Sequence, residues 1–237
     1  MASTSETSFG AKLRNAQDLV TYITGFTGYV PPRTQETAAS MTTLINSIIA
    51  TNATESSQQE NYKIAVDARQ SAFSKKTGSV DKLLSPIKGA VDAQYGKKST
   101  EAEALNAIIK KMRATKLTKA PADPTKPEQA TTISQSERSY GSITQSFNDI
   151  INTLSQFTGY NPTNNTIKVA TLQTVATQLT TLNTTVIQKI QPLKTTRASR
   201  QAQYTDLKDR VQRIKSYVKA QYGNTSAEYN MIKGLSI

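Results

Sequence analysis

The chain has 237 residues, of which 36% are hydrophobic and 6% aromatic, and it carries a formal net charge of +12 at pH 7. It contains no cysteine and no histidine, which excludes disulfides, thiol chemistry, the usual zinc sites and the ordinary acid–base residue of neutral pH. Its 17 acidic residues show no paired arrangement that recurs at helical spacing, so the sequence predicts no catalytic, metal or cofactor site and a protein that is not an enzyme.

The N-terminal segment and the hydropathy pattern argue against a membrane protein. Residues 1–17 contain no apolar run behind a basic region, and no stretch approaches the roughly 18 apolar residues that cross a bilayer. We therefore expect no membrane span and a cytoplasmic location, while a processed exported form would show the same pattern.

The first predicted helix occurs twice, over residues 9–25 and 139–156, and the same turn follows each occurrence. The sequence FTGYVP, starting at Phe26, recurs as FTGYNP, starting at Phe157, 131 residues later. Apolar residues of the second occurrence are spaced i, i+3, i+4 and i+7, as in an amphipathic helix. Glycine in the turn favours a left-handed helix cap, and the proline after it suits the start of another helix.

The second predicted helix, over residues 34–56 and 164–190, combines a hydrophobic stripe with a nearly uncharged outer face. Glu55 is the only charged residue in 37–58, and residues 169–188 contain none. Threonine fills most of the polar positions although it is a mediocre helix former, so helix propensity does not explain its frequency. Because interface cores are depleted in charge, such a face tolerates burial against another helix or another molecule.

The third predicted element covers residues 59–95 in the first occurrence and 192–222 in the second. The second occurrence has a heptad-like stripe and is predicted to form one long helix that ends at Gly223. In the first occurrence, Gly78 and Pro86 predict a break or a kink.

A short fourth helix is predicted to start at Ser99 and again at Ser226. Serine is a good N-cap, and an acidic residue follows two positions later in both cases, where the helix dipole favours it. The motif before this helix, IKGAVDAQYG from Ile87, recurs as IKSYVKAQYG from Ile214, now 127 residues later. The second copy is therefore shorter by about one helical turn.

Together these matches predict an all-α protein made of two tandem copies of a roughly four-helix unit. The copies cover residues 1–113 and 136–237, and residues 114–135, which contain three prolines, form a linker. We expect paired helical bundles with pseudo-two-fold symmetry. The sequence leaves open whether the copies form separate bundles or exchange elements.

Arg69 and Arg200 occupy matched positions on the core-facing side of the third element, each four residues before an aromatic ring. A charge there needs a partner, and the sequence favours a structural ion pair or a guanidinium at the bundle rim, with Glu101 and Glu228 as candidate partners. The alternative is an anion-binding site repeated once in each copy.

Tyr29 and Tyr160, each two residues before the proline of the repeated turn, are candidate binding residues of another kind. With Tyr95 and Tyr222 they would form an aromatic platform for a sugar, a peptide or a base. The sequence favours the other interpretation, in which these rings close the ends of the bundles.

The positive charge makes nucleic acid or another polyanion a candidate partner. Basic residues are spread over the whole chain, however, and no nucleic-acid-binding motif accompanies them. One concentration lies in the third element of the second copy, where the candidate binding residues are Lys208, Arg210, Arg213, Lys215 and Lys219. A merely solvated helix would arrange such residues in the same way.

The FTGYxP turn, an asparagine 23 residues after its tyrosine, and the ending IKxxVxAQYGxxSxE occur in both copies. In these features the chain resembles an uncharacterised family of bacterial helical proteins with tandem copies. The resemblance implies no activity, ligand or site residue.

Two functional hypotheses follow from the sequence. The first is a non-enzymatic interaction or structural scaffold protein, whose charge-poor, threonine-rich helix faces serve for homo-oligomerisation or for a protein partner. The alternative is a basic protein that binds nucleic acid through charge and largely without specificity. The first predicts an oligomer that is insensitive to salt, and the second predicts a monomer whose binding to DNA or RNA falls steeply with salt.

Overall fold

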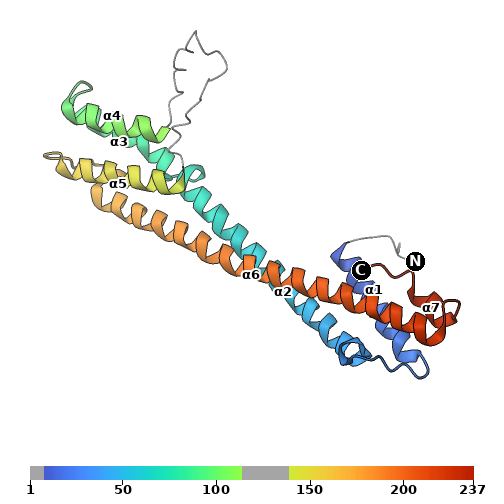
Figure 1. Ribbon diagram of the computed structural model, residues 1–237. Coiled ribbons are helices and arrows are strands. Elements are labelled where there is room, and N and C mark those ends of the chain that lie inside the picture. The colour runs from blue at the N-terminus through green and yellow to red at the C-terminus, as the bar shows by residue number, and fades with distance from the viewer. Residues whose placement is uncertain (1–7, 114–138) are drawn as a thin grey trace, which may run out of the picture. The chain divides into compact units, whose positions relative to one another are not determined.

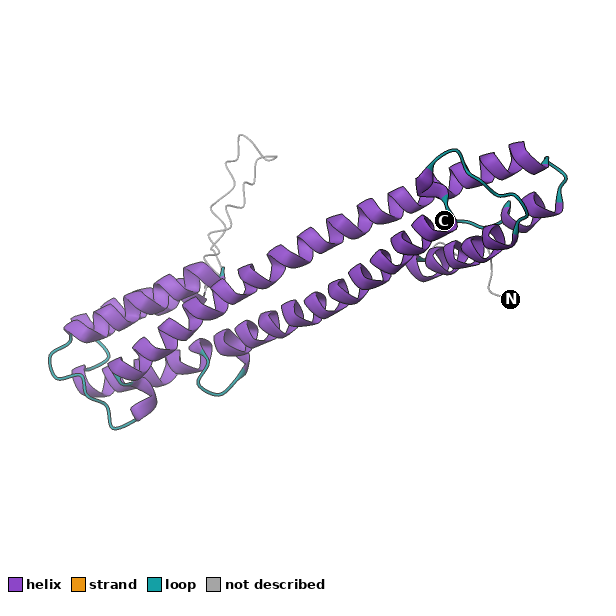
Figure 2. Cartoon of the chain, turned by 90° about the horizontal axis from the view of Figure 1, so that it is seen from below, coloured by secondary structure: helices purple, strands orange, loops and turns teal. Residues whose placement is uncertain are grey.

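The structure is a computed structural model that describes residues 8–113 and 139–237, so the predicted linker 114–135 lies outside the described residues. Every element of secondary structure in the described residues is a helix, and no strand occurs among them (Figures 1 and 2). The all-α fold class predicted from the sequence is therefore confirmed.

The helices follow one another in a similar order in both halves of the chain. The first half contains α1 (Phe9–Gly25), the 3-10 helix η1 (Thr34–Glu36), α2 (Ala38–Gln70), the π-helical turn η2 (Ser71–Lys75), α3 (Val80–Tyr95) and α4 (Thr100–Arg113). The second half contains α5 (Tyr140–Gln156), the 3-10 helix η3 (Asn165–Ile167), α6 (Val169–Tyr222) and α7 (Ala227–Ile232). Helices α1 and α5 begin and end within one residue of the predicted first helices.

Capping side chains and glycine turns set the ends of the short helices. Ser226 caps α7, because its hydroxyl accepts a hydrogen bond from the amide of Tyr229 at 3.1 Å. In the repeated turns, Gly28 and Gly159 have φ angles of 76° and 78°, a left-handed conformation that is costly for residues with a side chain. The predicted serine cap and glycine turns are thus confirmed.

The predicted boundary between the second and third helices is wrong in both copies. Helix α2 runs without interruption over 33 residues, and α6 is one helix of 54 residues. Residues 57–61 contain no glycine or proline that would stop α2, and Pro192 lies inside α6, where it removes a backbone donor without ending the helix. Gly78, with φ of 78°, does lie in a break before α3, whereas Pro86 lies inside α3.

The chain forms two compact units, and each unit combines parts of both sequence copies. Unit 1 consists of Met1–Asn61 and Ile190–Ile237, and unit 2 consists of Tyr62–Lys189. The predicted domains, residues 1–113 and 136–237, do not coincide with these units. In each copy the second and third predicted elements form one continuous helix, so the third element cannot fold back onto the second. It packs instead with the first two helices of the other copy.

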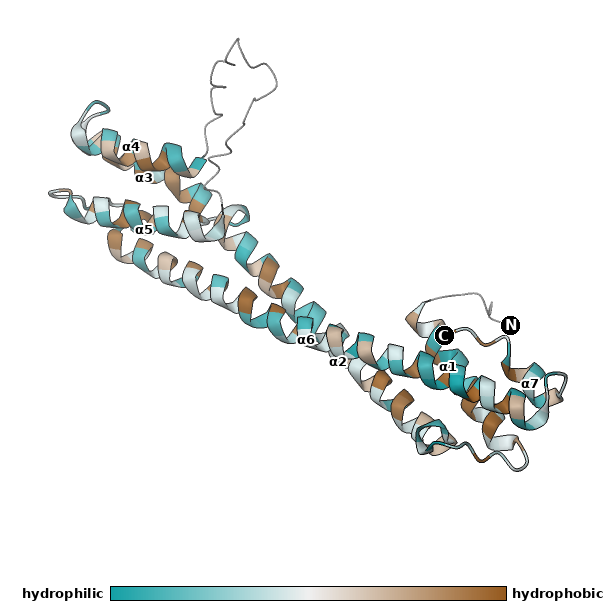
Figure 3. Ribbon diagram, viewed as in Figure 1, coloured by the Kyte–Doolittle hydropathy of each residue, from teal (hydrophilic) through white to brown (hydrophobic). Residues whose placement is uncertain are grey.

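The core of unit 1 joins α1, the first part of α2, the last part of α6, and α7. Its fully buried side chains include Leu19 from α1, Met41 and Ile48 from α2, Ile214 from α6 and Ile232 from α7. Figure 3 shows hydrophobic positions, in brown, alternating with teal or white positions along the helices. Burial of these apolar stripes is the main stabilising contribution of such a bundle.

The core of unit 2 is built from the matched elements, which are α5, the first part of α6, α3 and α4. Its fully buried side chains include Phe147 and Ile150 from α5, Leu172 from α6, Ile87 from α3 and Leu105 from α4. Each of these occupies the position of a buried residue of unit 1, at the offsets found in the sequence. The two cores therefore use one pattern of buried positions.

Hydrogen bonds join each FTGY turn to the AQYG ending of the other copy. In unit 1 the hydroxyl of Tyr222 donates to the carbonyl of Thr27 at 3.0 Å, and in unit 2 the hydroxyl of Tyr95 donates to the carbonyl of Thr158 at 2.9 Å. The glutamine before each tyrosine donates to the next carbonyl of the turn in the same way. The two motifs that define the repeat thus bind each other across the copies.

Candidate functional site

Arg200 belongs to an ion-pair cluster on unit 1. Its Nη1 donates to Oε2 of Glu55 at 2.8 Å, and Nε of Arg197 donates to Oε1 of the same carboxylate at 2.9 Å. The hydrogen bond from Arg197, with the positive charges of both arginines, holds the pKa of Glu55 below its usual value. The guanidinium of Arg200 also lies 4.7 Å from the ring centroid of Phe9. The ion-pair partner of Arg200 is therefore Glu55 rather than the expected Glu228.

Arg69, at the matched position of unit 2, has no such partner. Val186 occupies the position of Glu55, and among the described residues Arg69 forms neither a hydrogen bond nor an ion pair, so the expected pair with Glu101 is absent. Its Nε is buried without a hydrogen-bond partner, and its guanidinium lies 4.0 Å from the ring centroid of Tyr140, a cation–π contact. The sequence does contain a sign of this difference, because the residue 131 positions after Glu55 is the apolar Val186.

The candidate residues Tyr29 and Tyr160 use their hydroxyls within the fold. Tyr29 donates to the carbonyl of Glu36 at 2.9 Å, and Tyr160 donates to the carbonyl of Ile167 at 3.0 Å. Burial raises the pKa of both hydroxyls, to about 12 for Tyr160, and the charge of Glu36 adds to this effect at Tyr29. This geometry favours the packing interpretation over an aromatic platform for a ligand.

Two of the candidate basic residues of α6 are neutralised by acids of unit 1. Arg210 binds both carboxylate oxygens of Asp206, at 3.0 and 2.7 Å. Arg213 donates to Oε1 of Glu36 at 2.6 Å, and the side chain of Glu36 is only 4% exposed. Neither charge is therefore free to act on its own toward a polyanion.

The three candidate lysines of α6 differ from one another. Lys215 donates to backbone carbonyls of the segment 233–235, and burial lowers its pKa. Lys219 lies 5.9 Å from the ring centroid of Tyr229. Lys208 has no hydrogen-bond or ion-pair partner in the part of the chain that the structure describes. Of the five candidate residues, Lys208 is the one whose charge the fold does not use.

The threonine face of unit 2 is a stripe on α6 formed by Thr174, Thr177, Thr181 and Thr184. All four are exposed, and the stripe continues to Ile187, which is 60% exposed. Each hydroxyl donates to the carbonyl four residues earlier at 3.1 Å. The hydroxyl donors are thus already satisfied within the helix, which lowers the cost of removing water from this uncharged face.

The threonine face of unit 1 lies on α2 and is formed by Thr43 and Thr54, which are both exposed and lie on the same side of the helix, about three turns apart. Their hydroxyls donate to the carbonyls four residues earlier, at 3.1 and 2.9 Å. Ile49, on the same segment, is 42% exposed. Both units therefore carry an uncharged helix surface whose hydroxyl donors are internally bonded.

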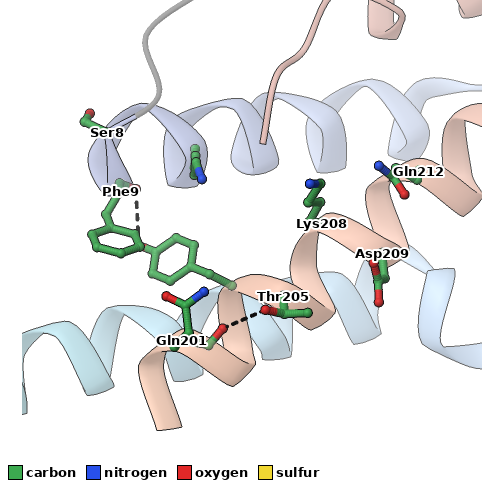
Figure 4. A pocket seen from close by; sticks show the side chains of 9 residues that line it. Ser8, Phe9, Gln201, Thr205, Lys208, Asp209 and Gln212 are labelled. Atoms are coloured by element: carbon green, nitrogen blue, oxygen red, sulfur yellow. Dashed lines mark hydrogen bonds between the residues drawn. The ribbon is translucent and has the colours of Figure 1, made fainter. Parts of the chain in front are cut away.

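A groove that the sequence did not reveal lies on unit 1, between the first turns of α1 and residues 201–212 of α6. Its volume is about 590 Å³, within the range of ligand sites. The rings of Phe9 and Tyr204 form one side, with centroids 4.6 Å apart, and Lys208 extends toward α1 (Figure 4). No local pattern could have indicated this groove, because its two walls are far apart in the sequence.

No helix in the part of the chain that the structure describes has the length and apolar character that a membrane crossing requires. Within residues 8–113 and 139–237, no three potential metal-ligating side chains lie together as a metal site.

Comparison with models of protein families, with curated proteins and with solved structures finds no match to this chain. The resemblance to a family of bacterial tandem-copy proteins therefore stays a prediction.

Proposed function

We propose that the protein is a non-enzymatic interaction or structural protein, which uses its threonine faces for self-association or for binding a protein partner. The observation that carries this proposal is the threonine face of unit 2, which is exposed, uncharged and internally hydrogen-bonded. Burial of a hydroxyl is costly when its donor loses water without gaining a partner, and these donors already have one. Ile187 adds an apolar side chain at the end of the same stripe.

We further infer that the chain consists of two copies of one helical unit. The matched buried positions of the two cores and the crossed bonds between turn and ending support this inference. In such a chain both threonine faces lie on the second helix of the repeat, so each is a candidate surface for association. The cytoplasmic location stays a prediction.

Sedimentation velocity over a range of protein concentrations, at about 100 and 500 mM salt, tests self-association. We expect a concentration-dependent oligomer with the same dissociation constant at both salts, because the threonine face contains no charge to be screened. A monomer at every concentration would contradict self-association.

The double substitution Thr177→Lys and Thr181→Lys tests the surface itself. Two ammonium groups at an interface core would weaken association by at least about tenfold, or 1.4 kcal/mol. The matched control is Thr195→Lys, because Thr195 is an exposed threonine of α6 with the same kind of backbone hydrogen bond, outside the uncharged segment. If the control weakens association equally, the threonine face of unit 2 is not the contact.

The net charge of +12 supports the alternative function, charge-driven binding of nucleic acid. The internal ion pairs of Arg210 and Arg213 reduce that support. Fluorescence anisotropy with labelled duplex DNA and single-stranded RNA, at about 50 and 200 mM salt, separates the two functions. Submicromolar binding that is lost at the higher salt would favour the alternative.

A further inference from the structure

Both units contain an aromatic pair at matched positions, so the groove of unit 1 can be compared with the same region of unit 2. The rings of Phe9 and Tyr204 in unit 1 have centroids 4.6 Å apart, and the matched rings of Tyr140 and Phe73 in unit 2 have centroids 4.7 Å apart. The segment that packs in the core of this pair in unit 2 therefore indicates what kind of segment fits the groove of unit 1.

In unit 2 the last turns of α4 share a core with this aromatic pair. Helix α4 packs on α3 and α5, and its residues Ile109 and Met112 are 4% and 5% exposed within the core that contains Phe73. At the end of α4, Nη2 of Arg113 donates to Oγ of Ser85 at 2.8 Å. The residue of unit 1 matched to Ser85 is Gln212, which lines the groove.

Unit 1 has no helix in the corresponding place among its described residues. Helix α7 starts at the position matched to the start of α4 but has 6 residues, whereas α4 has 14. Residues 233–237 leave the helical path, and Nδ2 of Asn15 binds the carbonyl of Ser236 at 2.7 Å. As a result, within the described residues nothing like the end of α4 covers Phe9, which is 40% exposed, or the groove beside it.

The groove also differs from its counterpart in charge. Lys12 and Lys208 line it, at the positions that Ile143 and Asp81 occupy in unit 2. Neither ammonium has a hydrogen-bond or ion-pair partner within the described part of the chain, and Asp209 is the one acid in the lining. Two unpaired ammonium groups favour a partner with carboxylates. The C-terminal end of a helix adds to this preference, because its dipole and free carbonyls are negative.

We propose that the groove of unit 1 binds the C-terminal end of an acidic amphipathic helix from a partner protein. Apolar side chains of that helix, spaced as Ile109 and Met112 are in α4, pack against the rings of Phe9 and Tyr204. Its acidic side chains face Lys12 and Lys208. This is recognition of an amphipathic helix in a groove. The groove is separate from the threonine faces, so the inference does not depend on self-association.

Two labelled peptides provide the test. One has the sequence of residues 100–113, and the other carries in addition the substitutions Lys110→Glu, Lys111→Glu and Arg113→Glu. Fluorescence anisotropy is measured with the full-length protein. We expect the acidic peptide to bind at least about tenfold more tightly than the native sequence, because both have the same apolar stripe and differ only in charge.

Protein variants then assign binding to the groove. The double substitution Lys12→Glu and Lys208→Glu should reverse the preference, so that the basic peptide binds more tightly. Lys194→Glu is the matched control, since Lys194 is an exposed lysine of α6 that does not line the groove. The variant Thr177→Lys, Thr181→Lys should bind the acidic peptide as the unsubstituted protein does, which separates this inference from the proposed self-association.

Three results would overturn the inference: no binding of the acidic peptide, equal binding of both peptides, or binding that the double substitution leaves unchanged. Binding of a DNA or RNA oligomer that requires Lys12 and Lys208, without binding of the acidic peptide, would overturn it as well and assign the groove to phosphate groups. Circular dichroism of each variant establishes that the helical fold is retained.

Discussion

Units 1 and 2 place the same arginine in different electrostatic surroundings. In unit 1, Arg200 is paired with Glu55 at 2.8 Å. In unit 2, Arg69 has the aromatic contact with Tyr140 but no carboxylate partner within residues 8–113 and 139–237, and Val186 stands at the position of Glu55. The surroundings of the matched arginines thus differ because Glu55 and Arg197 of unit 1 are matched by Val186 and Val66 in unit 2.

The units differ also in the helix that closes their cores. In unit 2, α4 is long enough to bury Ile109 and Met112 in the core that contains Phe73. In unit 1, α7 is a short helix and the same region is a groove. A framework shared by both units is therefore closed by a long helix in one unit and leaves a groove in the other, depending on one terminal element.

The largest effects are expected from matched core substitutions, Leu19→Ala in unit 1 and Ile150→Ala in unit 2. Both side chains are fully buried, so each truncation should lower the free energy of unfolding by about 2–5 kcal/mol. Hydrogen exchange locates the effect. Because α1 packs in the crossed core, Leu19→Ala should speed amide exchange in residues 204–218 of α6 and leave α3 protected.

The opposite exchange pattern would contradict the crossed arrangement: faster exchange in residues 80–95 after Leu19→Ala would mean that each copy packs with itself. Gln17→Ala, at an exposed position of α1, serves as the control and should leave exchange unchanged.

A smaller change in the free energy of unfolding is expected from substitutions of Glu55 and Val186, the matched residues near Arg200 and Arg69. Glu55→Val leaves Arg200 and Arg197 without their acid and should cost about 1–2 kcal/mol in urea unfolding at neutral pH. Since the pKa of Glu55 is lowered in the folded protein, this difference is fully present above the usual pKa of a glutamate and should be lost as the pH falls from there through the lowered pKa.

The reverse substitution, Val186→Glu, supplies unit 2 with the acid that it lacks. Its gain in pairing is offset by the loss of a buried apolar side chain, so the net change should stay within about 1 kcal/mol. Val186→Gln is the uncharged control of the same size. If the Glu and Gln variants are equally stable, the carboxylate is not pairing with Arg69.

The smallest effect concerns alkaline pH. Burial raises the pKa of Tyr160 to about 12, above its usual value of about 10, so the neutral hydroxyl stabilises the fold below pH 10. This contribution is lost as the pH rises from about 10 to 12, because the unfolded chain ionises first. Melting temperatures between pH 9 and 12 should therefore fall less steeply for Tyr160→Phe than for the unsubstituted protein. An identical slope would contradict the raised pKa.

The sequence by itself determined the helical class, the limits of α1 and α5, the turns and the short capped helices. These features depend on contacts within one or two helical turns, such as apolar spacing, the hydroxyl of Ser226 and the φ angles of Gly28 and Gly159, and such contacts can be inferred from neighbouring residues. The sequence also singled out Arg69 and Arg200, since a charge in an apolar pattern is visible without a structure, and Lys208 as one of a concentration of basic residues.

Only the tertiary structure decided which segments pack together. The sequence predicts a boundary near residue 57, but α2 and α6 continue, because propagation of a helix needs no further nucleation and a single proline does not end a long one. Because these helices are continuous, the third element of each copy packs with the first two helices of the other copy. The pairing of Arg200, the isolation of Arg69 and the groove beside Phe9 all follow from contacts between distant segments, which no local periodicity encodes.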